Sequence, residues 1–327
     1  MALRPAILTR RSPATSAATI GRRVVFSSSG DLTRAHGASG SPENPLRFGF
    51  LRTATESIFS VLFPSDCRLC QQPLVHASRL PVCPECLQAV TPVSGVLCVI
   101  CGERLPANAL PSGPADQADG PICEECRKTP PPYVQACAYG AYEGGLRDLI
   151  HLLKYDQVRP AARVLGSKLA EAMVRLAPAI GTADPMVVPV PLHKTKLRQR
   201  GFNQSELIAR AALKLKPGGL QLEMPPLLLV RRRATESQTG LTRNERGENV
   251  RGAFQARQPE RIAGRNILLV DDVFTTGTTI AECARVLRRA GAERIWVATV
   301  ARVLKSDSRP GLDEREMQRF IGAAAQA

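Results

Sequence analysis

The fold of this chain is decided by the stretch Ile267-Leu-Leu-Val-Asp-Asp-Val-Phe-Thr-Thr-Gly-Thr-Thr-Ile280. Its first four residues are apolar, which is typical of a buried strand in a parallel sheet. Apolar residues then recur with helical spacing from Ile280 to Leu287, so we expect a helix to begin at Ile280. The segment from Arg294 to Val300 predicts the next strand. The stretch therefore indicates an α/β fold, in which strand, polar loop, helix and strand follow in turn.

The polar loop between that strand and that helix has the features of a phosphate-binding site. Ligands of open α/β sheets bind beyond the carboxyl ends of the strands, and backbone N–H groups at a helix start favour anions. Gly277 allows the backbone to approach a ligand closely. Four hydroxyl groups can donate hydrogen bonds, and they belong to Thr275, Thr276, Thr278 and Thr279. Asp271 and Asp272 would repel a bare phosphate but can accept hydrogen bonds from sugar hydroxyls. The residues therefore predict a site for a phosphorylated sugar.

The whole stretch resembles the phosphoribosyl-pyrophosphate (PRPP) motif of type I phosphoribosyltransferases. An apolar strand, an Asp-Asp pair and the string Thr-Thr-Gly-Thr-Thr occur in the same register as in that motif. An acidic strand end that only caps a helix would account for one Asp, but not for the whole string. The resemblance implies that Asp271 and Asp272 bind the 2′ and 3′ hydroxyls of the ribose. It also implies that residues Thr275 to Thr279 surround the 5′-phosphate.

The composition indicates a protein of about two domains with anionic partners. A length of 327 residues suits about two domains. The formal net charge of +15 favours an anionic partner, but charge alone does not separate a nucleotide, a nucleic acid and a membrane surface. No run of about 18 apolar residues occurs, so the sequence predicts no membrane span.

The N-terminal segment differs in composition from the rest of the chain. Its first 30 residues contain no Asp or Glu and are rich in Arg, Ser and Ala. This composition fits an organellar transit peptide, and it also fits a disordered extension or a start codon assigned too far upstream. We favour a disordered extension over residues 1–45 and a cytoplasmic protein, either free or peripheral at the inner membrane. Organellar targeting is the alternative.

Eight of the ten cysteines form four pairs with the spacing Cys-x-x-Cys. They are Cys67, Cys70, Cys83, Cys86, Cys98, Cys101, Cys123 and Cys126. Two such turns supply the four thiolates of one tetrahedral zinc ion, so four turns predict two structural zinc sites in a reducing compartment. Successive pairs could share an ion, or the pairs could interleave. Metal binding would supply much of the folding energy of so small a module.

The rest of the chain continues the α/β pattern. Strands are expected over residues 133–142, 186–191 and 227–230, and helices over residues 48–63, 146–153, 161–176 and 203–215. Lys154 follows one of these helices, and we interpret it as a solvated lysine at a helix C-terminus. The segment from Lys194 to Arg200 carries four cations and no acid, and we expect it to be a loop facing the phosphate site. The polar segments 106–120 and 231–252 are expected to be an insertion and a lid.

With these pieces in order, the chain resembles the ComF family from about Phe63 to Arg302. The resemblance rests on the cysteine pairs and on five further motifs. These are Leu152-Leu-Lys-Tyr155, Val188-Pro-Val-Pro-Leu-His193, Arg200-Gly-Phe-Asn-Gln204, Gln238 with Arg246 and Asn249, and the stretch 268–279. The family implies a double zinc ribbon followed by a type I phosphoribosyltransferase-like domain, with a twisted, mainly parallel sheet and flanking helices. We therefore expect an extension over 1–45, the ribbon with its preceding helix over 46–129, the transferase-like domain over 130–305 and a tail over 306–327.

The resemblance implies two classes of function. In the first, the protein binds PRPP with Mg²⁺ and displaces its pyrophosphate in nucleotide salvage. Asp271, Asp272 and Arg200 would then be catalytic, and Arg198 would help to bind PRPP. In the second, it is a non-catalytic factor that senses PRPP or handles single-stranded DNA in competence, with DNA-uptake proteins bound by the ribbon. The sequence shows no general base for an acceptor. A fragment of residues 130–305 is expected to bind ligand without the ribbon.

Overall fold

The computed structural model describes residues 66–74, 78–106, 120–233 and 250–305. The expected helix over 48–63, most of the insertion and most of the expected lid lie outside these residues. So do the extension over 1–45 and the tail over 306–327.

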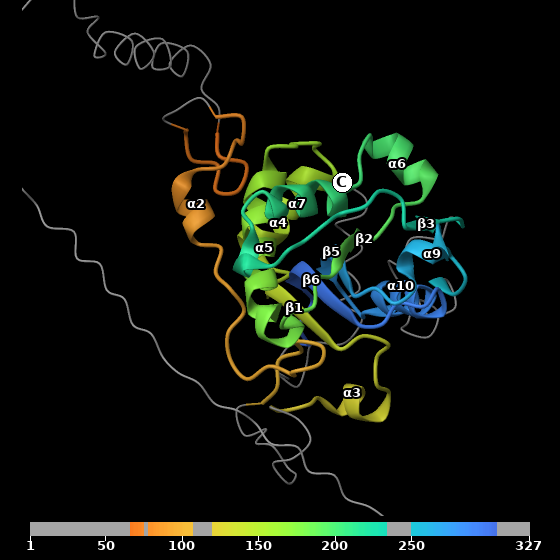
Figure 1. Cartoon of the computed structure of the whole chain (residues 1–327). Coiled ribbons are helices and arrows are strands. Elements are labelled where there is room, and N and C mark those ends of the chain that lie inside the picture. Colours follow the sequence, from red (N-terminus) through yellow and green to blue (C-terminus); the bar gives the residue numbers. More distant parts are fainter. Residues whose placement is uncertain (1–65, 75–77, 107–119, 234–249, 306–327) are drawn as a thin grey trace, which may run out of the picture. The chain divides into compact units, whose positions relative to one another are not determined.

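The main sheet has four parallel strands in the order β1-β6-β5-β2 (Figure 1). These strands are β1 (Gln135–Ala141), β6 (Ile295–Arg302), β5 (Ile267–Phe274) and β2 (Met186–Pro189). A separate antiparallel pair is formed by β3 (Leu229–Arg231) and β4 (Phe254–Ala256). Parallel neighbours need crossover connections, which the helices supply. The expected α/β fold with a mainly parallel sheet is therefore confirmed.

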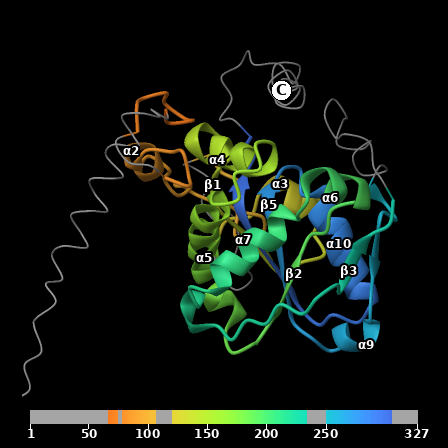
Figure 2. The ribbon, with the colours of Figure 1, turned by 90° about the horizontal axis from the view of Figure 1, so that it is seen from above.

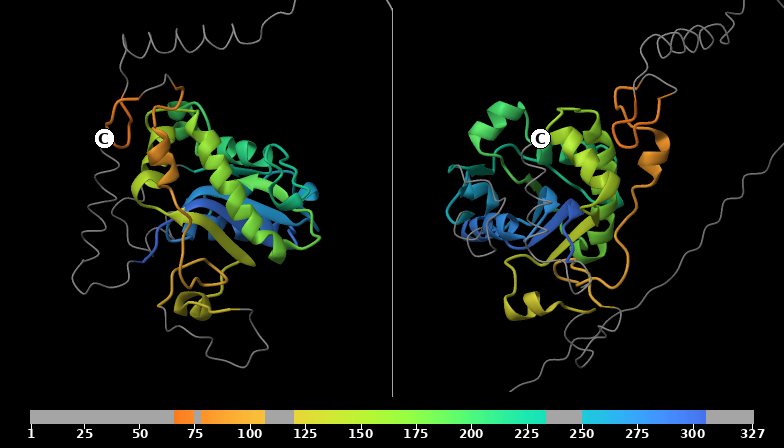
Figure 3. Two further views of the ribbon diagram at one scale, coloured as in Figure 1. Left: turned by 90° about the vertical axis from the view of Figure 1, so that its left-hand side faces the viewer. Right: turned by 180° about the vertical axis from the view of Figure 1, so that it is seen from behind.

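Helices cover both faces of the main sheet, because the side chains of β5 alternate between two apolar clusters. Leu268 and Val270 join one cluster with α4 (Gly144–Lys154), α5 (Ala161–Ile180) and α7 (Gln204–Leu213). Ile267 and Leu269 join the other cluster with α10 (Thr278–Arg289). Figure 2 shows α5 and α7 side by side, and the left view of Figure 3 shows α5 along the sheet. The short helices are α2 (Pro84–Gln88), α3 (Glu124–Lys128), α6 (Lys194–Arg200), η1 (Pro217–Gly219) and α9 (Pro259–Ile262).

Three features near the expected phosphate site differ from the prediction: where β5 ends, where α10 begins, and the structure of the segment after His193. Strand β5 continues through the acidic pair to Phe274, because Asp271 keeps its pairing register with Thr299 of β6. Helix α10 begins at Thr278 rather than Ile280, directly after Gly277 with its φ of 76°. The expected loop after His193 is helix α6.

The cysteine-rich segment packs against β1 through hydrogen bonds from both of its halves. In the first half, the Tyr139 hydroxyl donates to the carbonyl of Val90 at 2.9 Å, and the amide of Val93 donates to the carbonyl of Tyr139 at 2.8 Å. In the second half, the carbonyl of Ile100 accepts from the amide of Ala136 at 2.7 Å. The segment is thus joined to the sheet edge by ordered backbone as well as by the connecting chain.

Candidate functional site

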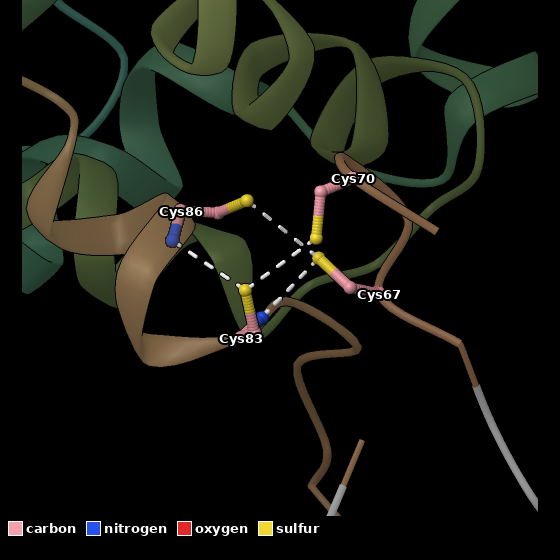
Figure 4. A group of neighbouring side chains, drawn as sticks. All are labelled: Cys67, Cys70, Cys83 and Cys86. Atoms are coloured by element: carbon pink, nitrogen blue, oxygen red, sulfur yellow. Dashed lines mark hydrogen bonds between the residues drawn. The ribbon is translucent and has the colours of Figure 1, made fainter. Parts of the chain in front are cut away.

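The eight paired cysteines form two four-cysteine clusters from successive pairs. Every sulfur within a cluster lies within 4.8 Å of the others. Cys67, Cys70, Cys83 and Cys86 form the first cluster, which Figure 4 shows with its sulfurs turned toward one another. Cys98, Cys101, Cys123 and Cys126 form the second. The question of pairing that the sequence left open is therefore settled in favour of successive pairs.

Both clusters have the dimensions of a tetrahedral zinc site. A Zn–S bond of about 2.3 Å places the sulfurs of a tetrahedron about 3.8 Å apart. The sulfurs lie 3.7 Å apart between Cys70 and Cys83 and 3.6 Å apart between Cys101 and Cys123. The backbone amide of Cys83 also donates to the sulfur of Cys67 at 3.3 Å, and such a bond favours the thiolate form that binds metal. The donors present thus fit two zinc ions.

The acidic pair lies at the carboxyl end of β5 with both side chains buried. Asp271 is 9% exposed, and its Oδ1 accepts a hydrogen bond from the Ser205 hydroxyl at 2.8 Å. Asp272 is 4% exposed, and its Oδ1 lies 3.5 Å from the side-chain amide nitrogen Nε2 of Gln204. Both partners stand at the start of α7, which Asn203 caps by accepting from the amide of Ser205. The start of α7 therefore holds the acidic pair in place.

Lys154 is not the solvated lysine expected from the sequence. Its side chain is only 16% exposed, and its ammonium forms an ion pair with Oδ2 of Asp272. The apolar stripe of α4 is buried against the sheet, so the C-terminal end of this helix points Lys154 toward the end of β5. Arg200 lies on the far side of Gln204 from the acidic pair. Its guanidinium donates to Oε1 of Gln204 at 2.6 Å and lies over the ring of Tyr155.

The two adjacent carboxyl groups differ in their proton affinity. Burial, followed by the neighbouring charge of Asp272, raises the pKa of Asp271 from 3.8 to about 8. Burial also opposes the charge of Asp272, but the ammonium of Lys154 and the hydrogen bonds with Lys154, Asp271 and Gln204 together outweigh it and hold the pKa of Asp272 below its ordinary value. The free site therefore favours one negative charge on the pair, neutralised by Lys154.

A cavity of about 180 Å³ connects the acidic pair with the loop from Thr275 to Thr279. Its lining includes both carboxylates, Lys154, Gln204, Arg231, Thr275, Gly277 and Thr279. Thr276 and Thr278 hydrogen-bond to each other at 2.8 Å instead. The backbone of the loop enters α10 at Gly277, so the amino end of a twelve-residue helix meets this cavity. The structure thus brings together the two groups of residues that the sequence predicted for one ligand.

Lys154, Lys196, Arg200 and Arg231 lie close enough for their charges to affect one another. Lys196 has its pKa lowered by partial loss of solvent and then by the positive charges of Arg231, Arg200 and Lys154. Arg231 is half-buried at the end of β3 and lines the cavity. Arg198 is exposed on α6 and does not line it. The cations close to the cavity therefore differ in part from the two arginines named from the sequence.

In the comparison with known proteins, two family models match separate parts of the chain. A double zinc ribbon domain matches residues 58–127, and a phosphoribosyl transferase domain matches residues 211–324. Competence protein F of Haemophilus influenzae is 29% identical over 239 residues, which span 70% of this chain and 93% of that protein. The DNA utilization protein YhgH of Escherichia coli K12 is 31% identical over 242 residues, which span 74% and 98%. The chain belongs to the ComF family.

A solved structure also aligns with part of this ComF-family chain. It is a hypoxanthine phosphoribosyl transferase from Trypanosoma cruzi, 16% identical, covering 46% of this chain and 69% of its own, with a TM-score of 0.28. In the described part of the ComF-family protein, no helix has the length and apolar character needed to cross a bilayer.

Sequence reasoning missed four residues of the site, for identifiable reasons. Gln204 and Lys154 stand inside two of the ComF-family motifs, but their roles depend on contacts with a strand far away in the sequence. Ser205 follows a motif directly and carries the shortest hydrogen bond to Asp271. Arg231 was assigned to the lid, whereas it ends β3. The family motifs were thus the available signal for the first three.

Proposed function

We propose that this ComF-family protein binds PRPP together with Mg²⁺ in the cavity at the carboxyl end of β5. The observation that carries the proposal is the cavity itself, where a buried acidic pair, a helix N-terminus and cationic side chains line one space. A sugar carrying anionic groups at two positions matches all three features. A bare phosphate offers no sugar hydroxyl to the buried carboxylates, and a neutral sugar offers no negative charge to the cations.

Each part of PRPP has its own group of residues in this proposal. The ribose hydroxyls donate to Asp271 and Asp272, and the 5′-phosphate lies at the start of α10, among the residues from Thr275 to Thr279. The diphosphate lies toward Arg231, Lys154 and the cations near Arg200. Mg²⁺ prefers phosphate and carboxylate oxygens, which the diphosphate and the acidic pair provide, and it would neutralise part of the ligand charge.

A panel of ligand fragments tests this assignment. Calorimetric titration with Mg²⁺ would compare PRPP, ribose 5-phosphate and pyrophosphate. We expect PRPP to bind at least about ten-fold more tightly than either fragment, because each fragment lacks the groups that would contact one set of these residues. Equal affinity for PRPP and ribose 5-phosphate would show that the protein has no subsite for the diphosphate.

Transfer of the phosphoribosyl group to an acceptor is a separate step. Among the described residues that line the cavity there is no histidine, cysteine or tyrosine to take an acceptor proton. Pyrophosphate release from PRPP, measured with a panel of purine, pyrimidine and pyridine bases, separates the two classes. Release that depends on a base would make the protein a transferase, and its absence alongside PRPP binding would make it a PRPP sensor.

Handling of single-stranded DNA is the second candidate function, favoured by the names of the relatives and by α6. This helix carries Lys194, Lys196, Arg198 and Arg200 without an acid. Replacing Lys194 and Arg198 by Gln should weaken DNA binding and reduce its salt dependence by about 0.7 in log–log slope for each phosphate that is no longer neutralised. Lys128→Gln, at an exposed lysine of α3 that pairs with Glu124, is the control. An unchanged salt slope in the double variant would exclude α6 as a DNA-binding element.

A further inference from the structure

Arg302, the last residue of β6, carries a buried guanidinium that is held by the second half of the zinc ribbon. It is 6% exposed, and it donates to the carbonyl of Cys101 at 2.6 Å and to Oε2 of Glu103 at 2.9 Å. The guanidinium nitrogen Nη2 also lies 3.7 Å from the sulfur of Cys101, a member of the second cluster. Glu103 is 7% exposed, and its other oxygen accepts from the amide of Lys305. A buried charge of this kind depends on its partner.

One face of the same guanidinium is turned toward the loop of residues 275–279, called the phosphate loop from here on. The guanidinium carbon Cζ of Arg302 lies 4.2 Å from the centre of the ring of Phe274, which is the last residue of β5. Phe274 is 4% exposed, and the carbonyl of this residue accepts from the amide of Val303 at 2.9 Å. Its ring lies so close to Gly277 that a Cβ there would approach ring atoms at 2.6 and 2.8 Å. The ring therefore packs directly against the loop backbone at Gly277.

We propose that Arg302, held by Glu103 and Cys101, is a positioning residue through which the second zinc cluster sets the conformation of the phosphate loop. The steps are contiguous: the turn from Cys98 to Glu103 fixes the guanidinium, the guanidinium fixes the Phe274 ring, and the ring supports Gly277. Binding of the phosphate ligand then depends on zinc in the second cluster, an inference that rests on the proposed function for the identity of that ligand.

The first cluster lacks this connection. Its surroundings meet α4 at the start of that helix, where a Cβ on Gly145 would lie 3.3 Å from Val90 and 3.4 Å from Leu69. Lys154 stands at the other end of α4. The described contacts of the first cluster therefore lead to the beginning of a helix rather than to the loop that binds the phosphate.

Two Glu→Gln variants in the same ribbon test the proposal. Glu103→Gln keeps the shape of the side chain but removes the charge that faces Arg302. Glu124→Gln, at a 78% exposed side chain of α3 that pairs only with Lys128 among the described residues, is the matched control. Amide hydrogen exchange over residues 275–279 is measured on the full, zinc-loaded chain without ligand, and the PRPP dissociation constant is measured by calorimetry. We expect Glu103→Gln to speed exchange and weaken binding by about 2- to 30-fold, and the control to change neither.

Arg302→Lys serves as a second variant should Glu103→Gln fail to fold, because it keeps the charge but loses the fork that reaches both partners. Unchanged exchange over 275–279 in these variants would overturn the proposal, even if PRPP bound more weakly. A wild-type protein that bound no PRPP would refute the proposed function, and the exchange comparison would then decide the coupling by itself.

Discussion

At the scale of single residues, the site depends on an electrical asymmetry between two neighbouring carboxyl groups. Asp272 is paired with Lys154, whereas Oδ1 of Asp271 accepts hydrogen bonds from the neutral hydroxyl of Ser205 and from a backbone amide. The protein therefore keeps one carboxyl ionised and favours a proton on the other. A sugar hydroxyl can meet either form, because a protonated carboxyl both donates and accepts.

The raised pKa of Asp271 predicts a pH-dependent stability. A carboxyl whose pKa is higher in the folded state binds its proton more tightly there, so stability falls as the pH rises from about 3.8 to about 8. Asp271→Asn cannot ionise and should escape this loss. We expect the melting temperature of the variant to rise relative to wild type as the pH increases through this window. Asp148→Asn, at a partly exposed carboxylate, should follow wild type, and parallel curves for Asp271→Asn would contradict the burial of this charge.

Gly277 and Gly264 form a matched pair for the phosphate loop. Both have positive φ, 76° and 70°, so alanine is strained at either position. A Cβ at Gly264 meets nothing within 4 Å, whereas at Gly277 it meets the Phe274 ring. We expect Gly277→Ala to lower the free energy of unfolding by about 1–3 kcal/mol more than Gly264→Ala does, as overpacking typically costs. Chemical denaturation measures the difference. Equal losses would show that the Phe274 ring moves aside for the added methyl group.

At the scale of elements, the predictable features were those encoded by neighbouring residues. The apolar run of β5, the stripe of α4 and the spacing of the cysteine pairs each act over a few residues, and each led to the observed element. The end of β5 was predicted too early because pairing with β6 carries the strand through Asp271 and Asp272. The role of Lys154 was missed because its partner lies more than a hundred residues away and only the tertiary fold joins them.

The two cysteine clusters should release metal at different rates. In the first cluster Cys70 is exposed and Cys86 is half-buried, whereas all four cysteines of the second are buried. A thiol reagent should therefore free one zinc ion quickly and the other slowly, because its access to the sulfur limits the reaction. A zinc-binding dye follows the release. Cys70→Ser should abolish the fast phase and keep the slow one. Release of both zinc ions from wild type in a single kinetic phase would contradict the difference in burial.

At the scale of the whole molecule, the ribbon and the transferase-like domain share buried contacts. The expectation that residues 130–305 act alone treated the linker as a boundary, yet this fragment would lack Glu103, the buried partner of Arg302. Removing one partner of a buried ion pair costs about 3–5 kcal/mol. We therefore expect the fragment to unfold at a much lower temperature than the full chain. A fragment as stable as the full chain in thermal unfolding would show that the contacts across the linker contribute little.

The central claim is that a phosphorylated ribose is held by the acidic pair at the end of β5. Its most direct test is calorimetric titration of PRPP with Mg²⁺ into wild type, Asp272→Asn and the control Asp148→Asn. A hydrogen bond to a charged group contributes about 1.5–3 kcal/mol, so Asp272→Asn should bind PRPP roughly ten- to a hundred-fold more weakly, while Asp148→Asn should match wild type. Absence of PRPP binding by wild type at about millimolar ligand, or equal binding by Asp272→Asn, would contradict the claim.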